Sequence, residues 1–187
     1  MNDPSRRRMG SLLRSSAAAF LTLLVVVAWC AGPACGQKVS KAGKSLGPVL
    51  EENILRYTNR ERRSQGLPGL HGSPALRFVA RKHSTDMCRT QTFRHESNSF
   101  PKGWETFPGR LRQVGLKAGG ENIGYRTLAE DPDTWAKKVV RGWMESPSHK
   151  RNILNPKFRY LGVGISGCKD KIGYATQVFS PDQGKIP

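Results

Sequence analysis

Cysteine is scarce in this chain, with four in 187 residues. Small secreted domains that depend on disulfides carry many more, so a hydrophobic core must supply most of the stability. Cys30 and Cys35 lie in the N-terminal segment, which leaves Cys88 and Cys168 in the remainder of the chain. These two either pair or persist as buried free thiols. We predict that they are close in space and can pair, because Cys88 ends a predicted helix that would cover the strand before Cys168.

Compact catalytic and nucleic-acid motifs are also missing. The chain contains no HExxH zinc motif, and no GxSxG elbow accompanies Ser84, Ser146 or Ser148. Cys88 lacks a nucleophile signature and is interpreted as structural. No basic run is interleaved with aromatic residues in the manner of a nucleic-acid platform. These absences disfavour a serine hydrolase and a specific nucleic-acid-binding function.

Long apolar runs are limited to one, at residues 17–31 near the N-terminus. It is shorter than the roughly 20 residues that a membrane-spanning helix needs. Four arginines precede it and small residues follow it, which is typical of a secretory signal peptide. We predict a signal peptide over residues 1–36, cleaved before Gln37, with an uncleaved N-terminal anchor as the alternative. The predicted location is secreted or extracellular, including the periplasm or the cell surface.

Acidic residues are few. The chain has 14 Asp and Glu against 31 Lys and Arg, for a net charge of +17 at pH 7. Removing residues 1–36 takes away four arginines and Asp3 and leaves +14. Such a charge favours anionic extracellular partners, which are acidic glycans, cell-wall polymers or anionic lipids. The alternative is that the charge only maintains solubility.

Polar residues 37–47 lack apolar periodicity and predict a linker, followed by one domain over residues 48–187. Ser and Asp before apolar periodic segments predict helix starts. The expected helices begin near Val49, Ser73, Pro108, Asp133 and Ser146. Asp133 is expected as the cap of the fourth helix, and the last helix is expected to run through Leu154. The expected strands are 121–126, 160–165 and 174–179. The fourth helix carries an apolar stripe of Trp135, Val139, Val140 and Trp143. Helices early and strands late predict an α+β layered domain.

Several stretches resemble one protein family in the same order. Phe93-Arg94-His95 is similar to an FxH loop, and Gly120-Glu121-Asn122 to a GEN motif. Residues 143–154 (WMESPSHKRNIL) resemble the bacterial WMxSPxHRxNIL block, and residues 161–164 and 174–177 resemble two closing strands. The chain thus resembles the CAP superfamily (cysteine-rich secretory proteins, antigen 5 and pathogenesis-related 1), of the bacterial SCP-domain type, over about residues 48–180. The resemblance implies a three-layer α-β-α sandwich with a small antiparallel sheet between helices.

The family often carries a cavity lined by two histidines and two glutamates that can hold a divalent metal. By position, His95 and Glu121 match one histidine and one glutamate, whereas Ser146 and Tyr174 replace the other two. Bacterial members carry the histidine of the SPxH motif instead, here His149. The resemblance therefore implies a site of His95, His149 and Glu121, and we hypothesise that these residues bind Zn²⁺ or another divalent metal.

Each of these residues also has a structural interpretation. His95 is alternatively an exposed loop histidine, Glu121 a carboxylate paired with a nearby Arg or His, and His149 an imidazole whose Nδ1 satisfies backbone groups in its own helical turn. His83 is interpreted as a hydrogen-bonded core histidine, because it lies on the apolar side of its predicted helix.

Two functions follow from these interpretations. The first is a secreted CAP-domain protein that acts as an extracellular binding or interaction module with a His/Glu-lined cleft. The alternative is a divalent-metal-dependent hydrolase that uses His95, Glu121 and His149, with a metal-bound water as the reactive group. We hypothesise that the three side chains line one cavity, with the two imidazoles close enough to share one ion. If they do not, the binding module alone remains.

Overall fold

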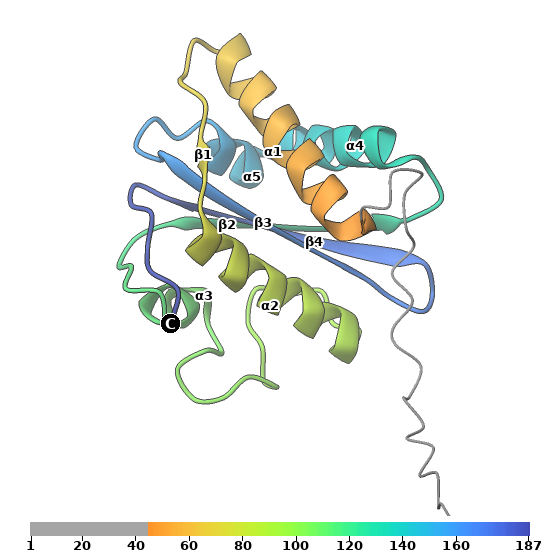
Figure 1. The fold of residues 1–187 in the computed structure, drawn as a ribbon, viewed down its shortest axis with the longest axis vertical. Helices are drawn as coiled ribbons and strands as arrows, with labels where there is room; N and C mark the ends of the chain where they lie inside the picture. Colours follow the sequence, from red (N-terminus) through yellow and green to blue (C-terminus); the bar gives the residue numbers. More distant parts are fainter. Residues whose placement is uncertain (1–44) are drawn as a thin grey trace, which may run out of the picture. The chain divides into compact units, whose positions relative to one another are not determined.

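The computed structural model describes residues 45–187. The signal-peptide prediction (1–36) and residues 37–44 of the predicted linker lie outside the described residues. The elements in chain order are α1 (Leu46–Ser64), β1 (His71–Gly72), α2 (Pro74–Thr90), α3 (Phe107–Arg112), β2 (Gly120–Thr127), α4 (Pro132–Glu145), α5 (Pro147–Ile153), β3 (Tyr160–Gly167) and β4 (Ile172–Ser180) (Figure 1). Among these residues, no helix combines the length and the apolar content needed to cross a bilayer.

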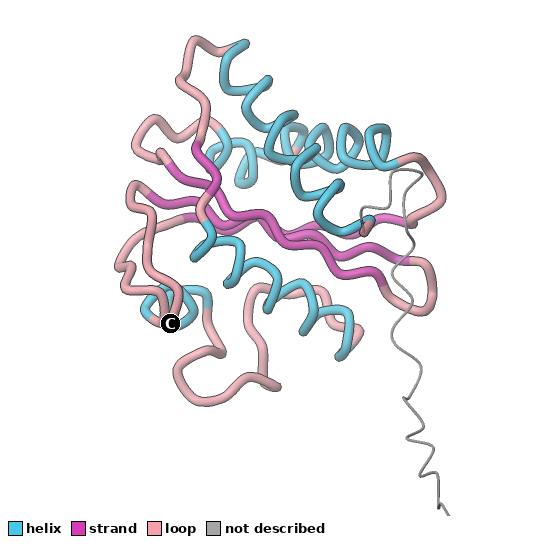
Figure 2. Tube along the Cα trace, in the orientation of Figure 1, coloured by secondary structure: helices cyan, strands magenta, loops and turns pink. Residues whose placement is uncertain are grey.

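One sheet separates two layers of helices. Its strand order is β1-β3-β4-β2; β3, β4 and β2 pair antiparallel, and the two-residue β1 pairs parallel with β3. Helices α1, α4 and α5 cover one face, and α2 and α3 cover the other (Figures 1 and 2). The predicted α-β-α sandwich is confirmed. The difference is the two-residue β1, which is not among the three strands expected from the sequence.

The start of α2 follows the predicted capping pattern. The hydroxyl of Ser73 accepts a hydrogen bond from the N–H of Leu76 at 3.2 Å, and Pro74 occupies the first turn. The start of α4 differs from the prediction, because Asp131 is the N-cap and accepts from the N–H groups of Asp133 and Thr134. A proline, residue 132, fills the first helical position, so the cap must precede it.

The start of α1 also differs from the prediction, whereas that of α5 agrees with it. Helix α1 begins at Leu46, inside the predicted linker, since Pro48 is tolerated in the first turn where backbone N–H groups have no helical acceptor. Ser146 is the N-cap position of α5, as predicted, but its hydroxyl makes no capping bond and lies 3.3 Å from Oγ of Ser148.

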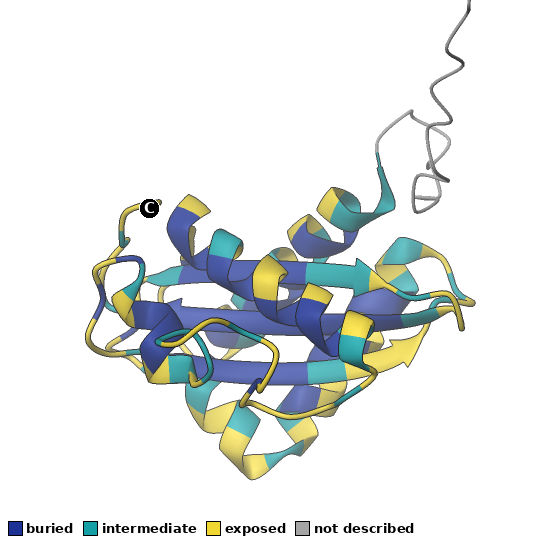
Figure 3. Cartoon of the chain, turned by 90° about the horizontal axis from the view of Figure 1, so that it is seen from below, coloured by how far each residue is buried: buried dark blue, intermediate teal, exposed yellow. Residues whose placement is uncertain are grey.

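The hydrophobic core has a main part on each face of the sheet. On the α1 side, the predicted stripe of α4 is buried against α1 and the strands. On the α2 side, apolar residues of α2 and α3 pack on the sheet around Val178. Figure 3 shows that the strands are buried along most of their length. Burial on both faces explains why the closing strands read as nearly continuous apolar runs.

Helix α2 lies directly against the backbone of β3. A Cβ atom on Gly162 would overlap the backbone at Leu76 and Arg77, and one on Gly164 would overlap the backbone at Ala80. Only glycine allows this approach of helix to strand.

A buried arginine ties the end of α1 to the segment after α5. Arg62 is fully buried, and its guanidinium donates to four backbone carbonyls. The acceptors are Ile153 (2.7 Å), Pro68 (2.9 Å), Asn155 (2.9 Å) and Phe158 (3.4 Å). Burial lowers the pKa of Arg62 from its ordinary value.

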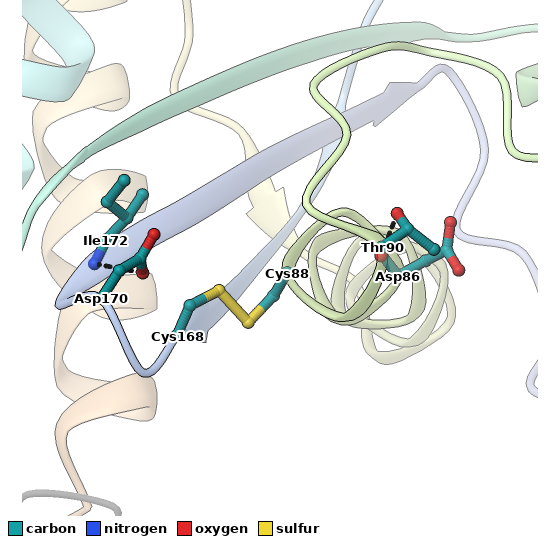
Figure 4. The surroundings of a disulfide bond; sticks show 6 residues. All are labelled: Asp86, Cys88, Thr90, Cys168, Asp170 and Ile172. Atoms are coloured by element: carbon teal, nitrogen blue, oxygen red, sulfur yellow. Dashed lines mark hydrogen bonds between the residues drawn. A yellow bond between two sulfur atoms is a disulfide. The ribbon is translucent and has the colours of Figure 1, made fainter.

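The predicted disulfide is confirmed. Cys88 and Cys168 are bonded, with a Cα–Cα distance of 5.7 Å, and the free-thiol alternative is wrong. The bond joins the last turn of α2 to the residue after β3 (Figure 4). Met87, Ile123 and Tyr174 form a small apolar cluster beside it.

Candidate functional site

Glu121 is the centre of a buried polar cluster on the α2 side of the sheet. Its side chain is 2% exposed, and both carboxylate oxygens accept from Nη2 of Arg110 at 2.9 Å. Nδ1 of His95 lies 2.9 Å from Oε1, and Nε2 of His83 lies 3.8 Å from the same oxygen. Four side chains from β2, α2, α3 and the loop after α2 therefore meet at one carboxylate.

Arg110 also positions the loop that carries His95. Its Nη2 donates to the carbonyl oxygen of His95 at 2.8 Å, and its Nη1 donates to the carbonyl oxygen of Glu105 at 3.3 Å. Arg110 itself is fully buried in α3. One buried cation thus holds the carboxylate and the backbone of the histidine loop together.

The two histidines next to Glu121 have opposite pKa shifts. The hydrogen bond to Glu121 raises the pKa of His95 above its ordinary value. Burial lowers the pKa of His83 to about 4, so His83 is neutral at pH 7 and its 3.8 Å approach to Glu121 is no ion pair there. For Glu121, burial opposes ionisation, but the bond to His95 and the charge of Arg110 outweigh it, and the pKa lies below its ordinary value.

His95 is the member of the cluster that reaches solvent. Its side chain is 45% exposed, whereas those of Glu121, Arg110 and His83 are buried. When Nδ1–H donates to Glu121, Nε2 of the neutral ring is an acceptor. The buried carboxylate therefore fixes the orientation of an accessible imidazole. His95 is an exposed loop histidine, as in its structural interpretation, and its role as a metal ligand stays a prediction.

His149 comes from the other helical layer. It lies on α5, and Nδ2 of Asn122 donates to its carbonyl oxygen at 3.1 Å. Burial, and then the charge of His95, lower the pKa of His149. Within residues 45–187 no hydrogen bond or ion pair joins His149 to Glu121. The structure thus brings His95 and Glu121 into contact and relates His149 to His95 through electrostatics alone.

The donor set around Glu121 does not fit a resident metal ion. Across residues 45–187, no group of three or more His, Cys, Asp or Glu side chains is arranged to hold one. Both oxygens of Glu121 already accept from Arg110, so the interpretation of Glu121 as a paired carboxylate describes its contacts. Metal binding by His95 and His149 stays a prediction.

Sequence reasoning missed Arg110 and misread His83. His83 is a core residue, as interpreted, but the hydrogen-bonding part was wrong, because neither ring nitrogen has a hydrogen-bond partner among residues 45–187. Arg110 lies within the helix predicted from Pro108, and nothing in its local pattern distinguishes a buried arginine from a surface one. Asn152 also braces the strand that carries Glu121, since its Nδ2 donates to the carbonyl oxygen of Glu121 at 3.2 Å.

Two exposed aromatic rings share a surface with this cluster. Phe93 lies in the His95 loop, and Tyr125 lies on β2 four residues after Glu121, so Tyr125 and Glu121 face the same side of the sheet. Their rings meet edge to face with centroids 4.8 Å apart, at 45% and 57% exposure. We call Phe93, His95 and Tyr125 the recognition surface.

The chain resembles several bacterial proteins. It is 33% identical over 136 residues to the uncharacterized protein YkwD of Bacillus subtilis, covering 71% of this chain and 49% of that protein. It is 32% identical over 124 residues to the uncharacterized membrane protein YlbC of the same organism, covering 65% and 33%. The chain thus spans half or less of the length of these curated relatives.

Solved structures show the same architecture. An extracellular protein containing an SCP domain from Bacillus anthracis superposes with a TM-score of 0.59 at 31% identity, covering 77% of this chain and 44% of that one. An outer surface protein of Borrelia burgdorferi shares the fold, with a TM-score of 0.57 at 18% identity, covering 73% and 92%. The model of the cysteine-rich secretory protein (CAP) family matches residues 55–179. The chain belongs to the CAP family.

Proposed function

We propose that this protein is an extracellular binding module whose recognition surface contacts the ligand. The observation that carries the proposal is the fixed but accessible imidazole of His95, held by buried Glu121 and Arg110 beside two exposed aromatic rings. Exposed aromatic side chains next to a few oriented polar groups are typical of ligand-contact surfaces. The bacterial relative described as an extracellular SCP-domain protein supports the location.

The pairing of Glu121 favours binding over hydrolysis. A carboxylate that activates water for attack on a substrate must be accessible to both, whereas Glu121 is 2% exposed and is held by Arg110 and His95. The cluster therefore serves to orient His95. The ligand that fits this surface has a ring or apolar face for Phe93 and Tyr125 and a hydrogen-bonding group for His95.

Saturation-transfer NMR with a fragment library of aromatic carboxylates, sugars and alkylamines tests the proposal. We expect at least one class to bind the wild type and to lose its signal in the Phe93→Ala, His95→Ala and Tyr125→Ala variants. The matched control is His71→Ala, another exposed histidine, on β1. Binding that survives all three changes, or that the control also loses, contradicts the proposal.

Zinc calorimetry tests the predicted metal site of His95, His149 and Glu121 separately. If His95 and His149 ligate zinc, the double variant His95→Ala, His149→Ala loses binding, and affinity in the wild type falls at acidic pH because protonated imidazole does not ligate. Equal zinc binding by the wild type and the double variant rejects the metal site, and with it the metal-dependent hydrolase.

A further inference from the structure

The outer face of α2 borders a groove of about 680 Å³. Its lining combines cations and aromatic rings from α2 with residues of the following loop, chiefly Arg77, Phe78, Arg81, Lys82, Arg89 and Phe100. No member of the recognition surface lines it, and neither do Glu121 and His149. The groove is therefore a separate feature, and the proposed function leaves it unexplained.

The cations follow the length of the helix. Arg77, Arg81 and Arg89 are four and eight residues apart, so they follow one inclined ridge of α2 that turns by about 120° around the helix axis from Arg77 to Arg89. At 1.5 Å per residue, the twelve residues from Arg77 to Arg89 span about 18 Å. Lys82 adds a fourth positive charge between them. A row of this kind matches an extended ligand with repeated negative charges better than a single small anion.

Two buried carboxylates hold these cations in place. Glu51 accepts two hydrogen bonds from Arg81 at 2.7 Å and lies 3.9 Å from Arg77, and Asp86 accepts from Arg89 at 3.0 Å. Both carboxylates are about 4% exposed, whereas the arginine side chains are 45% to 61% exposed. The groove thus presents four oriented cations against two carboxylates that lie beneath them.

Aromatic rings form the apolar part of the same surface. Nζ of Lys82 lies 5.3 Å from the ring centroid of Phe78 and 5.0 Å from that of Trp104, as cation–π contacts. Trp104 meets Phe78 and Phe100 edge to face, with centroids 6.0 and 6.4 Å apart. All three rings are half-buried, so they offer a recessed apolar patch beside the cations.

We propose that this groove binds an extended anionic polysaccharide, one whose sugar units carry carboxylate or phosphate groups. The guanidiniums contact the anionic groups, which suits their planar donor geometry. The C–H groups of the sugar units pack on Phe100 and on the part of Phe78 that Lys82 leaves exposed.

Two other polyanions fit the groove less well. Peripheral binding to an anionic bilayer needs several apolar side chains that protrude into the acyl boundary. Ile186 is the one strongly exposed large apolar residue that lines the groove in the described part of the chain, at 59%, and the rings are recessed. Single-stranded nucleic acid needs open ring faces for base stacking, and Lys82 already lies over Phe78 and Trp104.

Calorimetric titration of the full chain with polygalacturonate tests the site, with neutral dextran as the uncharged probe. The groove variant is Arg77→Ala, Lys82→Ala, which removes two exposed cations and keeps the bidentate Glu51–Arg81 pair. The matched control is Lys137→Ala, Lys157→Ala, which removes two exposed cations on α4 and after α5. We expect the groove variant to bind polygalacturonate at least tenfold more weakly than the control, and dextran to show no binding.

Three further arms make the result decisive. Raising the salt concentration should weaken polygalacturonate binding. The variant Phe78→Leu should weaken it without a change in charge, and His95→Ala should leave it unchanged, which separates this site from the recognition surface. Equal affinity of groove variant and control overturns the proposal. The proposal is also overturned if the protein binds phosphatidylglycerol vesicles or a thymidine oligonucleotide more tightly than polygalacturonate and the groove variant loses that binding.

Discussion

At the residue scale, Arg110 and Glu121 are buried charges that compensate each other. We predict that Glu121→Gln, which leaves Arg110 without its counter-charge, destabilises the protein by about 3–5 kcal/mol. Adding Arg110→Met to Glu121→Gln should recover part of this loss, because no buried cation then remains. The measurement is urea unfolding of both variants.

The control for this prediction is Glu145→Gln. Glu145 pairs with Arg141 on the surface of α4, with side chains that are 64% and 78% exposed. Exposed pairs contribute about 0–1 kcal/mol, so this change should have little effect. If Glu121→Gln costs no more than Glu145→Gln, the buried pair does not have the stabilising role assigned to it.

His83 predicts a pH dependence of stability. Its pKa is about 4 in the folded protein against about 6.5 in an unfolded chain. As pH falls from 6.5 towards 4, the unfolded chain binds a proton that the native state does not, so the free energy of unfolding decreases. His95 has the opposite effect, because its pKa is raised in the folded protein. Its contribution to the free energy of unfolding is therefore lost as pH rises through that folded-state pKa.

The variant His83→Leu isolates this effect. Between pH 7 and pH 4.5, we expect its free energy of unfolding to fall by about 2 kcal/mol less than that of the wild type. Urea unfolding at the two pH values measures the difference, with His71→Gln as the exposed-histidine control. If the free energy of unfolding of His83→Leu fell as much between the two pH values as that of the wild type, His83 would not be the source of the pH dependence.

At the scale of elements, Arg62 connects α1 to the chain around α5 by donating to four carbonyls. Arg62→Met leaves these buried acceptors without a donor, and we expect a loss of about 3 kcal/mol or more. Arg62→Lys should restore little, because one ammonium cannot reproduce the fork of donors. The exposed neighbour Arg63, changed to Met, is the control, and thermal and urea unfolding compare the three. Full rescue by lysine would contradict this account.

The disulfide connects α2 to the turn between β3 and β4. It joins residues 80 apart in the sequence, and closing a loop of that length predicts a stabilisation of about 4 kcal/mol. The double variant Cys88→Ala, Cys168→Ala should lose most of this in urea unfolding. Peptide mapping of the wild-type protein under non-reducing conditions should show Cys88 linked to Cys168. Equal stability of the reduced and oxidised protein would reject the prediction.

The elements themselves follow from local sequence patterns. Ser73-Pro74 predicts the start of α2 because capping depends on neighbouring residues, and the stripe of α4 predicts the buried face of that helix. The predicted cap of α4, Asp133, lies after the true one, because two aspartates flank Pro132 and the pattern favours either one. Such errors move a boundary and leave the layer order intact.

At the scale of the whole molecule, the candidate site was only partly predictable. His95 and Glu121 are indicated by family motifs, and the structure places Nδ1 of His95 2.9 Å from Oε1 of Glu121. Arg110 and His83 join them only because α3 and α2 pack on the same face of the sheet, and no local pattern records that packing. A buried charge cluster of this kind becomes visible only in three dimensions.

Gly162 and Gly164 leave no space between β3 and α2. Helix α2 and strand β3 are therefore expected to move together as a rigid unit, and a larger side chain at either glycine would push them apart. Amide hydrogens of both elements should exchange at one common, slow rate that reports global opening. The proposed polysaccharide would then bind to a surface of α2 that is already formed. Its association should therefore be fast, and binding should not make any of these amide hydrogens exchange faster.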